Sequence, residues 1–155
     1  MYLPEKDFLT LAYDPGEGGE RKGRQHLKEL SKFGTIITCG NGGYYGNAST
    51  PRLNKLYAAA DLFIFPASAD NSPNMVLESM ACGTPVLALK GTGAEEDIED
   101  GKTGFLTDDI ADMCNKVKYL SHQHFVENIG RNAYQYVQNN RLVKHEVDKF
   151  IPLYK

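Results

Sequence analysis

The sequence predicts an α/β protein with a doubly wound parallel sheet, in which helices cover both faces of the strands. Short apolar segments alternate along the chain with segments of helical pattern, as in successive βαβ units. The apolar segments are continuous runs, whereas a sheet with one solvated face alternates polar and apolar residues. We therefore expect a three-layer α/β/α architecture in a single domain over residues 1–155.

The expected strands are short apolar runs that turn residues separate. In chain order they are Phe8–Tyr13, Thr35–Cys39, Leu62–Phe65, Pro85–Leu89 and the segment at Phe105–Leu106. The second run is β-branched, and the third is fully apolar and ends at Pro66. Together they predict a parallel sheet of about five strands.

The expected helices lie between these strands and after the last one. They are Arg24–Lys32, Pro51 to about Ala60, Pro73 to about Cys82, and most of Asp108–Lys155 with a break near Ser121. A proline suits the first turn of a helix, because a backbone N–H at that position has no partner within the helix and its absence loses no hydrogen bond. Ser72 is the expected N-cap of the third helix, and Gly83 is expected to end it.

Composition and charge restrict the class of function. With 41% hydrophobic and 24% charged residues, the chain has ordinary globular composition, which excludes a disordered tail. A formal net charge of -3 lacks the basic excess of a dedicated nucleic-acid-binding protein. No apolar run approaches the roughly 20 residues of a membrane-spanning helix, and the polar N-terminus carries no signal-peptide pattern. A soluble, cytoplasmic domain is expected.

The sequence offers no metal-ligand spacing. The three cysteines are odd in number and widely spaced, so we expect free thiols in a reducing compartment: Cys39, Cys82 and Cys114. The four histidines share no common spacing: His26, His122, His124 and His145. The acidic segment Glu95–Asp100 lacks the pattern of a calcium-binding loop. No metal is therefore expected.

Ligands of doubly wound folds bind beyond the carboxyl ends of the strands, which draws attention to the segment after Phe65. There, Asp70 and Glu78 flank the start of the expected third helix. The unpaired N–H groups of Asn74, Met75 and Val76 would give this helix start the character of a phosphate site. The alternative is that both carboxylates are simply solvated.

A second candidate group is Arg21-Lys22-Gly23, which follows a glycine-rich loop after the first strand. Two cations at this edge could neutralise a diphosphate, or they could form an exposed loop tip. The loop does not match the dinucleotide fingerprint, and it is not a P-loop because Lys22 is followed by glycine.

Three stretches together resemble the C-terminal, nucleotide-sugar-binding domain of a retaining glycosyltransferase of family four, with the Rossmann-like GT-B fold. They are LYAAADLFIFPAS, DNSPNMVLESMACGTPVLAL and EEDIEDGKTGFL, which span residues 56 to 106 with short gaps. RKG resembles the phosphate-binding Lys-Gly of that family, and the C-terminal stretch resembles its closing helices. The segment before Leu56 is short, so one strand–helix unit of the family's domain is expected to be reduced.

The resemblance implies a role for each matching residue. Glu78 would hold the ribose hydroxyls of the donor, and Asp70, where the family usually has Glu, would lie beside the transferred sugar. Lys22, with Arg21, would neutralise the leaving phosphate. The remaining matches are the sugar-reading loop and the diphosphate donors: Asn71, Ser72 and Asn74, then Met75 and Val76.

The implied reaction is transfer of a sugar from a nucleotide diphosphate sugar with retention of configuration and without a metal. The acceptor, a glycan or a lipid-linked sugar, would bind an N-terminal domain that this chain lacks, so the isolated domain is expected to be inactive. Synthesis of glycans, polysaccharides or glycolipids is implied, with no nucleic-acid partner and no transmembrane segment; peripheral association of the full enzyme with a membrane is compatible with this.

Three alternatives remain open at the level of the sequence. A nucleotide-binding module without transferase activity would need the same residues from Asp70 to Glu78. A nucleotide-sugar epimerase would need a histidine in a crevice loop, and none of the loops after the expected strands has one. A flavodoxin-like signalling domain would use Asp14 as its acidic residue, which the glycines that follow disfavour.

Overall fold

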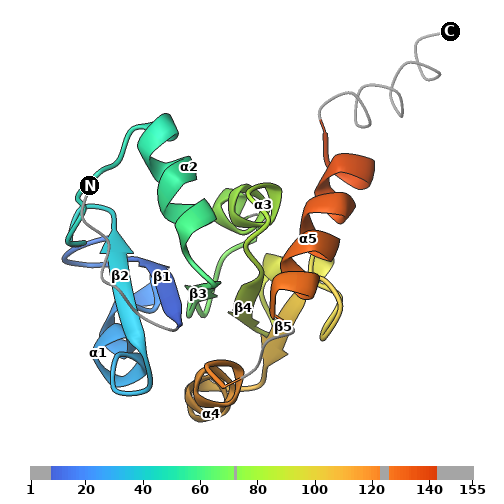
Figure 1. The fold of residues 1–155 in the computed structure, drawn as a ribbon. Coiled ribbons are helices and arrows are strands. Elements are labelled where there is room, and N and C mark those ends of the chain that lie inside the picture. Colours follow the sequence, from blue (N-terminus) through green and yellow to red (C-terminus); the bar gives the residue numbers. More distant parts are fainter. Residues whose placement is uncertain (1–7, 72, 123–125, 143–155) are drawn as a thin grey trace, which may run out of the picture.

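The structure is a computed structural model that describes residues 8–71, 73–122 and 126–142. Its centre is a five-stranded sheet in the order β2-β1-β3-β4-β5 (Figure 1). The strands are β1 (Leu9–Tyr13), β2 (Thr35–Cys39), β3 (Leu62–Phe65), β4 (Val86–Leu89) and β5 (Gly104–Thr107). Every neighbouring pair is parallel. The predicted doubly wound parallel sheet is therefore confirmed.

Helices lie on both faces of this sheet, as Figure 1 shows. One face carries α2 (Thr50–Ala59), α3 (Asn74–Ala81) and α5 (Val126–Asn140). The other carries the short α1 (Leu27–Leu30) and α4 (Ile110–Leu120). Three 3-10 turns complete the described elements: η1 (Glu20–Lys22), η2 (Arg24–His26) and η3 (Gly93–Glu96).

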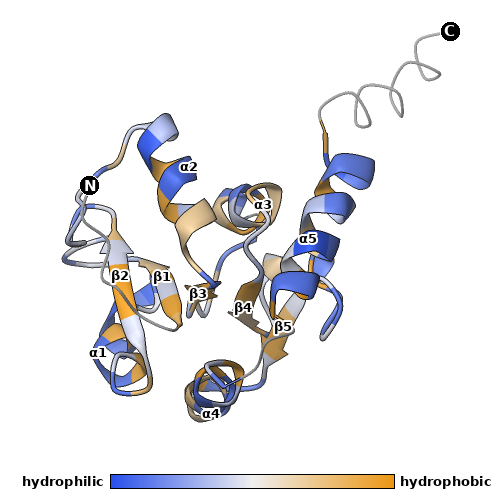
Figure 2. Ribbon diagram, viewed as in Figure 1, coloured by the Kyte–Doolittle hydropathy of each residue, from blue (hydrophilic) through white to orange (hydrophobic). Residues whose placement is uncertain are grey.

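Two separate cores explain why the strands are apolar throughout. Within β3, Phe63 and Phe65 pack into the core under α2, α3 and α5, whereas Leu62 and Ile64 pack into the core under α1 and α4. Alternate side chains of a strand point to opposite faces, so a strand that is covered on both sides buries all of them. In Figure 2 the central strands are largely apolar and the outward turns of α5 are hydrophilic.

Two expected helices differ from the sequence prediction. Residues 20–26 form η1 and η2 about the left-handed Gly23, so that only Leu27–Leu30 remain α-helical within the expected Arg24–Lys32. The helix expected from Pro73 begins at Asn74, and Pro73 occupies the N-cap position. Ser72, the expected cap, lies outside the described residues, as do the last residues of the expected C-terminal helix.

The strand order predicts a ligand-binding crevice at the carboxyl edge of the sheet. The chain moves outward from β1 to β2 on one side and to β3 on the other. Where the strand order reverses, the loops after the two central strands separate, and ligands of such folds bind there. The loops that follow β1 and β3 contain Lys22 and Asp70.

Candidate functional site

The loop after β1 is fixed by Asp14. Its Oδ1 atom accepts hydrogen bonds from the Gly16 N–H and from Nε of Arg24, both at 2.9 Å. The loop therefore turns back over the end of β1 before it reaches Arg21 and Lys22. A short polar side chain that bonds the backbone two residues later is a common way to hold such a turn.

Gly23 holds the basic pair against the end of β3. Its φ angle is +82°, and a Cβ atom there would lie 2.2 Å from the carbonyl oxygen of Pro66. The N–H of Ser68 also donates to the carbonyl of Arg21 at 3.0 Å. Glycine is required here for both its conformation and its size, and the result is that the loops after β1 and β3 are in direct contact.

Lys22 and Asp70 form an ion pair at this contact. The ammonium donates to Oδ2 of Asp70, and the two side chains are 37% and 13% exposed. Asp70 is thus the more enclosed partner, while the ammonium remains open to an anion from solvent. The exposed Arg21 side chain makes no ion pair with another described residue.

The loop after β4 supports the backbone of Asp70 and Asn71. The N–H of Gly93 donates to the carbonyl of Asp70 at 2.7 Å. A Cβ atom on Gly93 would lie 2.1 Å from the carbonyl oxygen of Asn71. The Thr92 side chain caps η3 by accepting a hydrogen bond from the Ala94 N–H. Gly93, which contacts Asp70 and Asn71, is therefore the first residue of a capped 3-10 turn.

The start of α3 differs in one respect from the sequence prediction. The N–H of Val76 donates to the carbonyl of Pro73 at 2.9 Å, so it is not an unpaired donor. This bond closes the first turn of the helix on the N-cap residue. Asn74 and Met75 donate no backbone hydrogen bond to another described residue, and Asn74 is exposed. Asn71 is exposed beside them.

Glu78 has a partner that sequence reasoning missed. The hydroxyl of Tyr57, from α2, donates to Oε2 of Glu78 at 3.3 Å. Tyr57 is fully buried, and burial together with the Glu78 charge raises the pKa of its phenol well above its ordinary value. The phenol therefore stays protonated and remains a donor. A tyrosine on an apolar helix face was the available signal, because a buried hydroxyl needs a partner.

Glu78 also affects the end of β2. Burial, and to a lesser degree the Glu78 charge, raises the pKa of the Cys39 thiol to about 11. Glu78 itself is exposed.

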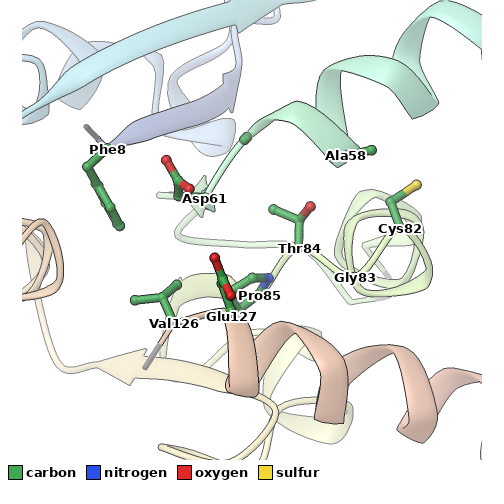
Figure 3. Close-up of a pocket in the computed structure, with 10 residues that line it drawn as sticks. Phe8, Ala58, Asp61, Cys82, Gly83, Thr84, Pro85, Val126 and Glu127 are labelled. Atoms are coloured by element: carbon green, nitrogen blue, oxygen red, sulfur yellow. The ribbon is translucent and has the colours of Figure 1, made fainter. Parts of the chain in front are cut away.

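A cavity is also present at the opposite, amino edge of the sheet. A cavity of about 570 Å³ lies there, where Phe8, Asp61 and Pro85 precede their strands (Figure 3). It contains none of the predicted site residues. A second hollow, of about 390 Å³, is lined by residues of the loop after β1, among them Asp14, Glu20 and Arg24. Strand topology and the Lys22–Asp70 pair favour the carboxyl edge.

The described residues hold neither a cluster of metal ligands nor a helix that could span a membrane. Among residues 8–71, 73–122 and 126–142, no three His, Cys, Asp or Glu side chains gather as they would around a metal ion. In the same part of the chain, no helix has the length and apolarity needed to cross a membrane.

Comparison with known proteins gives a consistent family and fold. The model of a family described as glycosyl transferases group 1 matches residues 16–123. A D-inositol 3-phosphate glycosyltransferase of Paenarthrobacter aurescens is 38% identical over 105 residues, which are 68% of this chain and 24% of that protein. A sulfoquinovosyl transferase of Arabidopsis thaliana is 33% identical over 96 residues, or 58% of this chain and 19% of that protein.

Two solved structures show the same fold as this chain. A sucrose-phosphate synthase of Thermosynechococcus elongatus has a TM-score of 0.82 at 21% identity, covering 98% of this chain and 46% of its own. HepE of Anabaena, in complex with UDP-glucose, has a TM-score of 0.75 at 20% identity. The match covers 95% of this chain and 48% of the HepE chain. The chain thus spans less than half of each solved relative, and about a quarter or less of the two curated ones.

Proposed function

The chain belongs to the glycosyl transferases group 1 family, and from this membership we propose that it is the donor-binding domain of a retaining glycosyltransferase. The observation that carries the proposal is the Lys22–Asp70 ion pair at the carboxyl edge of the sheet. It brings a cation for the leaving phosphate and a carboxylate for the transferred sugar to one point in the crevice. The donor is a nucleotide diphosphate sugar, the class to which the UDP-glucose bound by HepE belongs.

Glu78 and Tyr57 support a ribose-binding role. The Tyr57 hydroxyl donates to Oε2 of Glu78, which orients the carboxylate and leaves Oε1 to accept from a ribose hydroxyl. Charge-assisted hydrogen bonds of this kind are about twice as strong as neutral ones. The N–H groups of Asn74 and Met75, with the dipole of α3, would then face the diphosphate. Asn71 and Asn74, with Ser72, would contact the sugar hydroxyls.

The ion pair suggests how the leaving phosphate is stabilised. A bound diphosphate would compete with Asp70 for the Lys22 ammonium, and the released carboxylate would face the sugar. Negative charge on the phosphate grows as the sugar–phosphate bond breaks, so the cation stabilises the transition state more than the bound donor. Lys22, Arg21 and the start of α3 supply this charge in place of a metal.

The rest of the reaction needs parts outside this chain. A second, N-terminal domain would bind a glycan or lipid-linked acceptor and close over the crevice, which excludes water. Acceptor and leaving phosphate would meet on the same face of the sugar, which gives retention. By itself the cytoplasmic donor-binding domain would bind donor and turn over little. The biosynthesis of glycans, polysaccharides or glycolipids is the process that this reaction serves.

Calorimetric titration of the chain with UDP-, GDP- and ADP-sugars tests the binding step. We expect saturable binding of one nucleotide class, and clearly weaker binding in Glu78→Ala. A second assay follows sugar transfer by the full-length protein that contains this chain, with product configuration determined by NMR. Donor binding without transfer would indicate a nucleotide-binding module, and an inverted product would refute retention.

A further inference from the structure

We propose that Asp97, Tyr136 and Arg141 form a clamp that positions the Asp70–Asn71 backbone through the loop after β4. The three side chains lie outside the crevice, so they are positioning residues and do not contact the donor. The inference rests on the proposed function, because it assigns a second layer of residues to the same site.

The clamp joins the end of α5 to the end of η3. Oδ1 of Asp97 accepts hydrogen bonds from Nε of Arg141 at 2.5 Å and from the Tyr136 hydroxyl at 3.3 Å. Nη2 of Arg141 also donates to the carbonyl of Glu96 at 3.5 Å. The same carbonyl lies 3.3 Å from the Tyr136 hydroxyl, whose single proton is shared between it and Asp97. Asp97 is only 9% exposed. Removal of the cation from such an enclosed ion pair leaves the carboxylate charge uncompensated, which is strongly destabilising.

The clamp is connected to the site through four residues of η3. Glu96 ends η3, and Gly93 begins it. The N–H of Gly93 donates to the Asp70 carbonyl, and its α-carbon lies so close to the Asn71 carbonyl that no Cβ would fit. A displacement of Glu96 would therefore move the two residues that the Gly93 backbone contacts.

The other end of this loop is less constrained. Gly91 has a φ angle of +77°, and no atom lies within 4 Å of the position of a Cβ there. The Thr92 hydroxyl donates to the Leu89 carbonyl at 3.0 Å, which ties the loop only to the strand it leaves. Ala94 anchors η3 in the core, and the clamp adds side-chain hydrogen bonds at the C-terminal end of η3.

A neighbouring bond of α5 provides a matched control. Nδ2 of Asn132 donates to the carbonyl of Lys102 at 3.1 Å, in the loop before β5. It also ties α5 to a loop by a side-chain-to-carbonyl bond, but it does not involve η3. Asn132→Ala should therefore reproduce any general loosening of α5 without displacing Gly93.

The test compares Arg141→Ala, Tyr136→Phe and Asn132→Ala with the wild-type chain. The first readout is hydrogen exchange of the Gly93 amide, which needs no ligand. The second is the ratio of affinities for a nucleotide sugar and its nucleoside diphosphate, with UDP-glucose and UDP as the first pair and the GDP and ADP pairs after it. Tyr136→Phe keeps the ring and removes only the hydroxyl, so it serves if Arg141→Ala does not fold.

Displacement of the Asp70–Asn71 backbone should affect the sugar end of the donor selectively. We expect Arg141→Ala to accelerate exchange at Gly93 and to lower nucleotide-sugar affinity by roughly 3- to 10-fold while diphosphate affinity changes little. Arg141→Lys, which keeps a cation, should recover part of both effects. Asn132→Ala should leave exchange at Gly93 and the affinity ratio as in the wild type.

Two failures can be distinguished. If Gly93 exchange is unchanged in both clamp variants, or if Asn132→Ala has the same effect, the clamp is only part of general α5 packing and the inference is overturned. If exchange responds but the wild-type chain binds none of the nucleotides, the positioning stands as a structural relation and the proposed donor-binding function fails.

Discussion

Nζ of Lys22 is hydrogen-bonded to Oδ2 of Asp70, although 48 positions separate them in the sequence. Gly23 and Ser68 create this proximity, through the close approach of Gly23 to the Pro66 carbonyl and the Ser68–Arg21 backbone bond. In a parallel sheet the loops after two neighbouring strands leave from the same edge. The two opposite charges of the candidate site therefore meet because β1 and β3 are adjacent.

Lys22→Ala should reduce turnover more than donor affinity in the full-length protein. The expected loss of turnover is about 10²-fold, by analogy with removal of one donor that stabilises a developing negative charge. Donor binding to the wild-type chain should also weaken with added salt, because this ammonium is accessible to solvent. Steady-state kinetics and titrations at several ionic strengths measure both effects.

The matched control for this variant is Lys118→Ala, which removes an exposed cation from the last turn of α4. It changes the net charge equally and leaves the crevice unaltered. Equal kinetic effects of the two variants would mean that Lys22 acts only through net charge, and unchanged turnover in Lys22→Ala would assign it to an exposed loop tip.

Glu78→Ala should weaken binding of a nucleoside diphosphate by roughly 10- to 150-fold, since a hydrogen bond to a charged group contributes about 1.5–3 kcal/mol. Tyr57→Phe should have a smaller effect in the same direction, because it removes only the hydroxyl that orients the carboxylate. Isothermal titration measures each affinity. Glu29→Ala, an exposed glutamate on α1, serves as the control. Undiminished binding in folded Glu78→Ala would leave Glu78 as a solvated carboxylate.

Local sequence patterns were sufficient to predict most of the strands and helices. The features that were not predicted depend on contacts between segments that are distant in the sequence. The bounds of β2 and β3 follow directly from their apolar residues. In contrast, the Val76 N–H is occupied because Pro73 takes the N-cap position, which residue types alone do not reveal. Arg141 and Asp97 are 44 positions apart in the sequence, so no local sequence pattern predicts their ion pair. Long-range side-chain pairs depend on how the helices pack.

Gly23→Ala should destabilise the fold and separate the two site loops. Alanine is unfavourable in the left-handed region by about 1 kcal/mol, and here its Cβ would also overlap the Pro66 carbonyl. Gly18→Ala is a matched control, since Gly18 has φ +74° with nothing within 4 Å of a Cβ. Urea unfolding should show a larger loss for Gly23→Ala than for Gly18→Ala. Equal losses would show that the contact with Pro66 can relax.

Stability should fall at alkaline pH, in part because of Cys39. Its pKa is about 11 in the folded chain against an ordinary value of 9.0. A thiol with a raised pKa contributes stability that is fully present below pH 9.0 and is lost as the pH rises toward about 11. From this group we expect a decrease of at most about 2–3 kcal/mol in the free energy of unfolding. Urea unfolding of Cys39→Ala should show a shallower decline over this range, and an identical decline would contradict the prediction.

A pair of charge reversals separates the two edges of the sheet. Arg21→Glu places a negative charge beside the proposed diphosphate site and should weaken nucleotide binding strongly. Glu127→Lys reverses an exposed charge at the 570 Å³ cavity of the opposite edge. A strand of five residues separates these edges by roughly 15 Å, about twice the screening length at physiological salt. Glu127→Lys should therefore leave affinity nearly unchanged in calorimetric titrations at 0.15 M salt. If instead Glu127→Lys alters binding and Arg21→Glu does not, the nucleotide occupies the amino-edge cavity and the proposed site is wrong.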